Sequence, residues 1–152
     1  MSLNAQRTQS VSKPVLTLLR RRVQRVRLEP SVLARWAHEL DRLAQIDGRG
    51  FDPDEAALIL RVTGEVQDVV MAPFDTLWRQ AELFLSACLF VAVSDGQYTI
   101  EQSRHISHLA GRLGWSAARL SKLEDQVLND LERRGRLRLG RQEEFFNDAL
   151  SH

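Results

Sequence analysis

The residues of this sequence that are of a type to do chemistry lie in settings that argue against a catalytic centre. Cys88 is the only cysteine, so it forms no disulfide within the chain, and it lies in the most apolar stretch. A nucleophilic thiol needs exposure and an activating neighbour, so we expect Cys88 to be a small core residue. The sequence also lacks a serine-elbow motif and a glycine-rich phosphate loop. We therefore predict that the chain is not an enzyme.

Two histidines are the next candidates. His105 and His108 are three residues apart, which places them on one face of a helix. Neither an H-E-x-x-H pattern nor a cysteine pair accompanies them, although zinc sites usually carry such partners. We expect partly exposed histidines that do not bind metal.

The turn at Asp95 imitates the end of a calcium-binding loop, with an aspartate, a glycine and an apolar residue in the matching places. The start of the loop does not match, because its first and third ligand positions would be Val91 and Val93, which offer no side-chain oxygen. An aspartate before glycine commonly accepts hydrogen bonds from the amides of its own turn. The pattern thus excludes an EF-hand and favours a structural turn.

Arginines concentrate near the start of the chain. Seven basic residues precede Glu29, the first acidic one, and the remainder has 14 basic and 20 acidic side chains. A helix with such an arginine face can meet a partner protein, anionic lipid, nucleic acid or the acidic body of its own domain. The acidic remainder argues against nucleic acid. The candidate partner-binding residues are Arg20, Arg21, Arg22 and Arg25.

The elements that must position these residues belong to one domain. A chain of 152 residues with 43% hydrophobic and 27% charged residues is long enough to bury a real core. We expect a disordered lead at 1–13, a basic amphipathic helix at 14–29 and a helical domain at 31–150. The longest apolar run, 87–93, is too short to span a bilayer. With its lone cysteine, the chain is expected in the cytoplasm.

The first half of the sequence predicts three helices. Apolar residues at spacings of 3, 1, 4 and 3 predict an amphipathic helix over 14–27, which Pro30 stops. Ser31 can cap a second helix that ends at Asp47-Gly48. Asp52 and Glu55 form a capping box for a third helix that continues toward Val70.

The second half predicts up to four more helices. A helix from about Asp75 to Ser94 is apolar almost all round in its second half, so it must be central. Thr99 and Gln102 form a capping box for the fifth helix, which ends at Gly114. Ser116 opens a sixth helix that ends at Gly135, and 141–150 is a short seventh. Tryptophans 36, 78 and 115 and the phenylalanines at 145 and 146 are expected to anchor the core.

The pattern repeats once along the chain. An offset of 47 superposes Phe51–Gly64 on Tyr98–Gly111, and an offset of 48 superposes Asp47-Gly48 on Asp95-Gly96. Two copies of helix, Asp-Gly turn and capped helix suggest two hairpins packed with pseudo-twofold symmetry. Chance similarity between capped amphipathic helices is the alternative explanation. The predicted fold is therefore an all-α bundle of about six to seven helices with two helix–turn–helix repeats.

These residues resemble the TerB-like family, the helical domain of tellurite-resistance proteins and of some membrane-anchored DnaJ co-chaperones. The family signature is an apolar helix, Ala-x-x-Asp-Gly, an apolar residue, Ser or Thr, two variable residues and Glu, then a helix ending near Leu-Gly. Here the second copy is 92–102 followed by Leu113-Gly114, and the weaker first copy is 44–55. The resemblance covers about 31–131 and implies an all-helical domain that is not an enzyme.

The resemblance also implies a metal site, because a metal-binding role has been proposed for acidic residues of the signature in some members. Carried over, the role would fall on Asp47, Glu55 and Asp95. The second copy departs from the family by having Gln102 in place of glutamate, which removes a charge that a hard divalent cation wants. Capping and turn formation explain the same acidic residues without a metal.

The leading hypothesis is a non-enzymatic TerB-like module that acts by protein–protein interaction, as a scaffold or regulator in a stress-response or membrane-associated system. Its partner is an unidentified protein or a second copy of the chain, and residues 14–27 can contact an anionic membrane peripherally. The alternative is a domain that binds a divalent cation through Asp47, Glu55 and Asp95. No other cofactor is expected.

Overall fold

The structure, a computed structural model, describes residues 13–46, 59–60, 63–64, 68–93 and 98–133. All regular elements within these ranges are helical, which confirms the predicted all-α class. Residues 1–12, most of the predicted third helix and the predicted seventh helix lie outside the described ranges. The elements are α1 (Lys13–Val26), α2 (Pro30–Ala44), the 3-10 helix η2 (Phe74–Gln80), α4 (Ala81–Ala92), α5 (Ile100–Arg112) and α6 (Ala117–Arg133).

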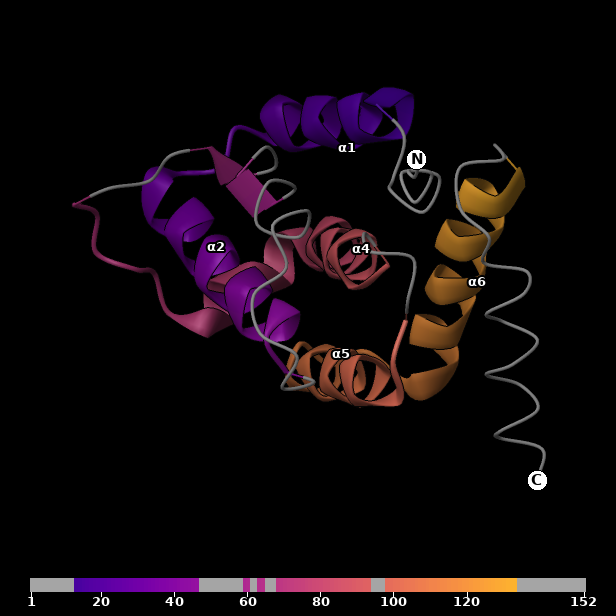
Figure 1. The fold of residues 1–152 in the computed structure, drawn as a ribbon. Coiled ribbons are helices and arrows are strands. Elements are labelled where there is room, and N and C mark those ends of the chain that lie inside the picture. The colour runs from indigo at the N-terminus through magenta and orange to yellow at the C-terminus, as the bar shows by residue number, and fades with distance from the viewer. Residues whose placement is uncertain (1–12, 47–58, 61–62, 65–67, 94–97, 134–152) are drawn as a thin grey trace.

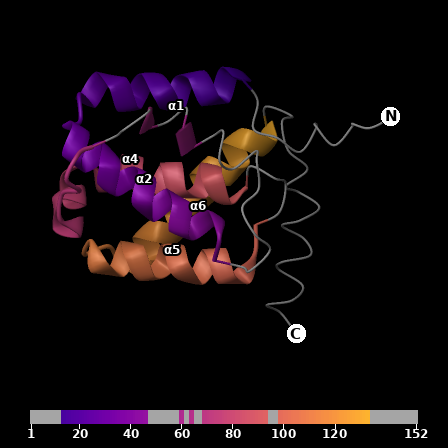
Figure 2. The same ribbon diagram turned by 60° about the vertical axis from the view of Figure 1, so that its left-hand side comes forward.

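Helix α4 is the centre of the bundle, as its composition predicts. Helices α1, α2, α5 and α6 surround it and each packs against it (Figure 1). In the turned view, α1 and α5 run along opposite sides of the molecule with α4 between them (Figure 2). Every residue of α4 except Glu82 is buried. A helix that is apolar all round has to be covered on every side, which happens at the centre of a bundle.

Helix α1 docks on the body through its apolar stripe. Leu19 and Val23 are buried and Val26 is partly buried, in contact with the core. Arg21, Arg22 and Arg25 are exposed. The apolar side of α1 is therefore used for folding, and its arginines remain at the surface.

The predicted caps around α5 are confirmed in detail. The Thr99 hydroxyl accepts from the Gln102 amide at 3.1 Å, and the Gln102 side chain accepts from the Thr99 amide at 3.1 Å. At the other end Gly114 takes φ +82°, and the Trp115 amide donates to the Ala110 carbonyl at 2.9 Å. The Gly114 amide donates to Gly111 at 3.0 Å, which completes a Schellman motif.

The start of α6 also follows the prediction. The Ser116 hydroxyl accepts a hydrogen bond from the Arg119 amide at 3.1 Å, as an N-cap residue does. The chain therefore passes from α5 to α6 through a turn whose two ends are both fixed by hydrogen bonds. This turn places Trp115 and the first turn of α6.

The predicted junction between α1 and α2 is wrong in two respects. Helix α1 ends at Val26, and Arg27 turns the chain with a left-handed φ of +51°, so Pro30 does not stop the helix. Pro30 instead begins α2, and Glu29 is its N-cap without a side-chain cap hydrogen bond. Ser31 is therefore not the cap. Proline suits the first helical position because its missing N–H has no helical partner there.

The segment before α4 differs from the predicted single helix over 75–94. It begins as the seven-residue 3-10 helix η2, and α4 follows at Ala81 and ends at Ala92. In a 3-10 helix residues three apart share a side, so Phe74 and Leu77 are buried together. Trp78 turns outward with 62% of its surface exposed, so the prediction that it anchors the core is wrong.

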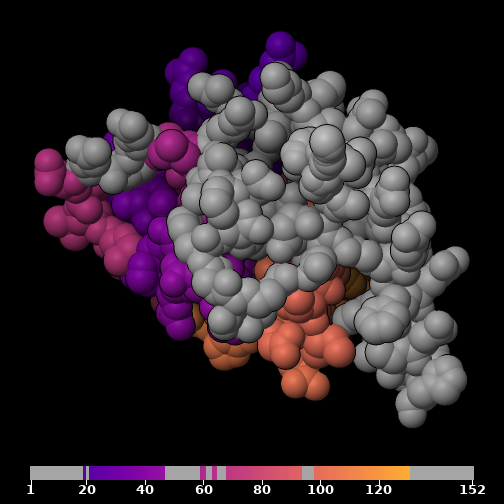
Figure 3. Space-filling model, viewed as in Figure 1, coloured from indigo at the N-terminus to yellow at the C-terminus, as the bar shows by residue number. Residues whose placement is uncertain are grey.

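The predicted third helix does not continue to Val70. Ile59, Leu60 and Thr63 are helical, but Gly64 has φ +72° and residues 68–73 have no regular structure. Gly111, its partner in the predicted repeat, lies inside α5, so the two copies differ at this position. Residues 68–73 project beside α2, at the left of Figures 1 and 3. The Ser31 carbonyl accepts a bond from Ala72 there at 3.0 Å.

Candidate functional site

A groove with four arginines is the most distinctive surface of the described chain. It has a volume of about 580 Å³ and lies between α1, the η2–α4 junction and the turn from α5 to α6. We call it the arginine groove. Its charged and aromatic lining residues are Arg22, Arg25, Trp78, Arg79, Glu82, Trp115 and Arg119.

The contribution of α1 follows from helix geometry. Successive residues turn by about 100°, so Arg22 and Arg25 lie on one flank of the stripe formed by Leu19 and Val23. That flank faces the groove, which both arginines line. Arg21 is on the side opposite Leu19 and lines no part of the groove. The predicted arginine face is therefore divided: Arg22 and Arg25 line the groove, whereas Arg21 faces solvent.

The other wall comes from η2 and α6. The Arg79 guanidinium carbon lies 5.7 Å from the centre of the Trp78 ring, and that of Arg119 lies 4.0 Å from the centre of the Trp115 ring. A guanidinium stacked on an aromatic face keeps its in-plane N–H donors free. These donors suit carboxylate or phosphate oxygens, which they can bind two at a time.

The described lining of the groove carries little negative charge. The ion pair between Arg35 and Glu39 lies outside the groove, because neither residue lines it. Glu82 is the one acidic residue among the described residues of the lining, which include four arginines. The surface therefore attracts anionic groups.

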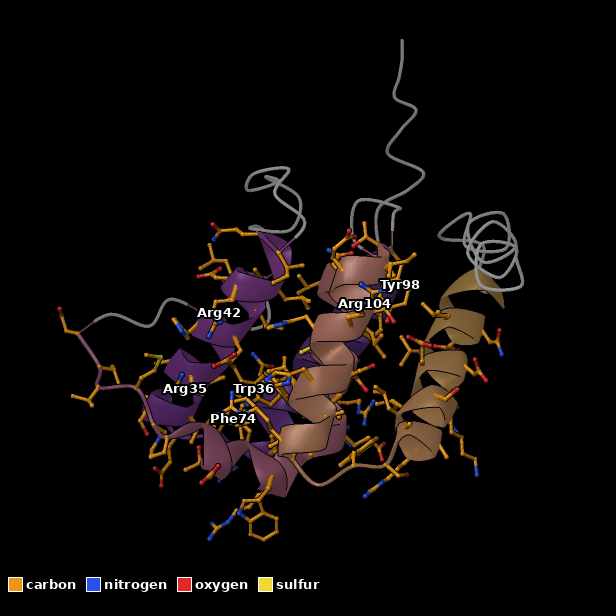
Figure 4. The ribbon with its side chains drawn as sticks, turned by 90° about the horizontal axis from the view of Figure 1, so that it is seen from below. Arg35, Trp36, Arg42, Phe74, Tyr98 and Arg104 are labelled. Atoms are coloured by element: carbon orange, nitrogen blue, oxygen red, sulfur yellow. The ribbon has the colours of Figure 1, made fainter. Side chains whose placement is uncertain are left out.

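A second polar cluster lies on the other side of α4, between α2 and α5. Glu39 is 2% exposed, and its Oε2 accepts from Arg35 Nη1 at 3.1 Å. Its Oε1, His105 Nε2 and Trp36 Nε1 are buried without a hydrogen-bond partner in the structure. Figure 4 shows Arg35 and Arg42 on α2, with Trp36 and Phe74 turned inward.

Burial and charge set the ionisation of this cluster. Burial lowers the pKa of His105 below its ordinary value; Arg42 and His108 lower it further, and Glu39 opposes them. Burial, with Glu39 nearby, raises the pKa of the Cys88 thiol well above normal. Cys88 is fully buried, as predicted, so it is a neutral core thiol.

Neither histidine acquires the partners of a metal ligand in the described residues. His105 is half-buried and His108 is exposed, which agrees with the predicted partial exposure. The described ranges contain no group of three His, Cys, Asp or Glu side chains able to hold a metal ion. Arg35 and Arg42 also make the surroundings of Glu39 and His105 unfavourable to a cation.

Tyr98 ties the entrance of α5 to α6. Its hydroxyl donates a hydrogen bond to Glu124 Oε2. Burial raises the pKa of Tyr98, and Glu124 raises it further. Burial also raises the pKa of Glu124, which the Tyr98 hydrogen bond opposes. The pair links two helices at a partly buried position, and its groups are engaged with each other.

The structure describes only some of the site residues predicted from sequence. Asp47, Glu55 and Asp95 lie outside the described residues, as does the side chain of Arg20, so the metal site stays a prediction from sequence. Arg22 and Arg25 line the groove, whereas Arg21 does not. Arg79 and Arg119 are not predicted from sequence, because no local pattern marks them and only the fold brings them to α1.

Compared with known proteins, the chain matches no family model, no curated protein sequence and no solved structure. The resemblance to TerB-like domains therefore rests on its signature residues alone. Among the described helices, none combines the length and apolar character needed to cross a membrane.

Proposed function

We propose that this chain is a non-enzymatic helical module that binds a partner protein through the arginine groove. The observation that carries the proposal is the convergence of Arg22 and Arg25 with Arg79 and Arg119 on one groove. These arginines come from three separate parts of the chain. The Asp-Gly signature supports a TerB-like role, as a scaffold or regulator in a cytoplasmic or membrane-associated stress response. We also propose that the two copies of helix, Asp-Gly turn and capped helix pack with pseudo-twofold symmetry.

The packing of α1 bears on one rival explanation of its arginines. A basic helix can dock its charges on the acidic body of its own domain. Here α1 is held by Leu19 and Val23, while Arg22 and Arg25 are exposed and make no ion pair with a described acidic residue. This arrangement supports an external anionic partner.

The direct test is chemical crosslinking of the tagged chain in a lysate of its source, followed by capture and mass spectrometry. The test variant carries Arg22→Glu and Arg25→Glu, and the matched control carries Arg104→Glu, an exposed arginine of α5 outside the groove. We expect the wild type and the control to capture the same specific proteins and the double variant to lose them. The captured set should also shrink as salt is raised.

Circular dichroism melts of all three chains show whether the variants are folded. A folded double variant that captures the same proteins as the wild type would overturn the proposal. Capture of nucleic acid in place of protein, released by nuclease, would also overturn it.

A further inference from the structure

The arginine groove continues into a second hollow with a different lining. This hollow has a volume of about 800 Å³ and lies between α1, α4 and α6. Arg22 and Glu82 line both spaces, so they form the boundary between them. We call the second space the α6 hollow. Its lining also includes Phe90, Leu123, Val127 and Asp130.

The α6 hollow offers an apolar surface beside the charged one. Phe90 is 9% exposed and Leu123 is 6% exposed, so their accessible edges form part of its wall. Val127 is partly buried and packs against the same core. Apolar edges recessed between polar residues are typical of pockets that take an anchoring side chain.

The adjacent spaces restrict the chemistry of the occupant. A nucleic acid strand needs basic residues along its path. Among the described residues that line the α6 hollow, Arg22 is the one basic residue, and Glu82 and Asp130 are acidic. A small phosphate would use the arginines and leave the apolar edges uncovered. A protein segment can present carboxylates and an apolar side chain together.

We infer that the arginine groove and the α6 hollow together bind one acidic amphipathic segment of the partner protein. Carboxylates of the segment contact Arg22, Arg25, Arg79 and Arg119, and an apolar side chain lies against Phe90, Leu123 and Val127. This inference rests on the proposed function and specifies the chemistry of its partner. Arg119 is held over Trp115, so one of the contacting guanidinium groups is already oriented for a carboxylate.

The test is a selection from a random peptide library displayed on phage, against the full chain. The enriched peptides are then measured one by one on a folded Arg25→Glu and Arg79→Glu variant, which plays no part in the selection. The control target is Arg21→Glu, whose residue is on the same helix but lines neither space. We expect enriched peptides to combine Asp or Glu with apolar residues. They should bind the wild type and the control equally and the double variant at least about tenfold more weakly.

Changes in the selected peptide separate the two spaces. Replacing its acidic residues by amides should weaken binding about tenfold, and so should replacing its apolar residue by serine. A photo-crosslinker at the apolar position should label residues of α4 or α6 that line the α6 hollow. Labelling elsewhere, or binding that survives either replacement, would overturn the inference.

The library result can fail independently of the crosslinking result. If no peptide is enriched, or if enriched peptides lack acidic residues, the inferred segment is wrong. The proposed function still stands in that case if the Arg22→Glu and Arg25→Glu variant loses its captured proteins. If a phosphorylated peptide binds and its carboxylate counterpart does not, the groove recognises phosphate, and the inference is again overturned.

Discussion

Arg35 and Arg22 are both arginines of helices that pack against α4, but they face different surroundings. Arg35 donates to Glu39 at 3.1 Å and to the Ala72 carbonyl at 2.8 Å, so two of its donors hold parts of the fold together. Arg22 lies between two open spaces and pairs with no described acidic side chain. On the α2 side of α4, Arg35 is used for structure, whereas Arg22 on the α1 side has no such role among the described residues.

The same contrast holds for aromatic residues. Trp36 of α2 is fully buried, and its ring centre lies 5.4 Å from that of Phe84 in an edge-to-face arrangement. Trp78 is the most exposed of the three tryptophans and lines the arginine groove. One residue type therefore serves the core on one side and a surface groove on the other. Residue type alone does not reveal which role applies.

The largest expected effect is at Phe84, which contacts the aromatic core on the α2 side. We expect Phe84→Ala to lower the free energy of unfolding by about 3–5 kcal/mol, because it leaves a cavity between Trp36 and Phe74. Urea denaturation followed by circular dichroism measures this. Trp78→Ala is the matched aromatic control and should cost less than about 0.5 kcal/mol. If the two variants lose the same free energy of unfolding, the α2 side and the groove side do not differ in the way described.

A smaller effect is expected at Glu39. We expect Glu39→Ala to cost about 1–3 kcal/mol, because Arg35 then lacks its partner at a partly buried position. Glu82→Ala is the counterpart on the groove side and should change stability by less than about 0.5 kcal/mol. Thermal melts of both variants at the same pH make the comparison. A stable Glu39→Ala chain would show that the polar cluster is not structural.

The stability of the α2 side should also depend on pH, because of His105. Its pKa is lowered in the folded state, so the unfolded chain binds more protons in the range just below the ordinary value of about 6.5. Stability should therefore be retained above that value and decline as the pH falls through it. Melting temperatures measured between about pH 7.5 and 5.5 test this. His105→Gln should flatten the decline, and an equally steep decline in the variant would assign the effect to other groups.

Local chemistry made parts of the fold predictable. The capping box of Thr99 and Gln102, the left-handed Gly114 and the cap at Ser116 each depend on neighbours a few residues away. The central position of α4 follows because an all-apolar helix has no polar face that can be exposed to solvent. These features were predicted correctly for the same reason: few competing arrangements satisfy them.

The errors arose where two local solutions compete. Both Pro30 and Ser31 are suited to a helix start, and the chain uses proline at the first helical position with Glu29 before it. The η2 segment has apolar residues that fit either period, and the 3-10 period turns Trp78 outward. No residue in either segment decides the matter without its tertiary surroundings.

The candidate site was predictable only in part. Arg22 and Arg25 belong to a run of arginines that stands out in the sequence, whereas Arg79 and Arg119 are single basic residues in separate helices. Their meeting depends on α1 packing against α4 through Leu19 and Val23. A groove assembled from three parts of the chain leaves no local pattern.

The smallest change in stability is expected for a variant of the arginine groove, and this variant gives the most direct test that the groove binds a partner. The free energy of unfolding and the binding of a selected acidic peptide should be measured on the wild type and on the Arg25→Glu and Arg79→Glu variant. We expect the stability of the variant to be within about 0.5 kcal/mol of the wild type and its peptide binding to be at least about tenfold weaker. Unchanged binding, or a loss of stability as large as that of Glu39→Ala, would contradict the claim that the arginine groove is a free binding surface.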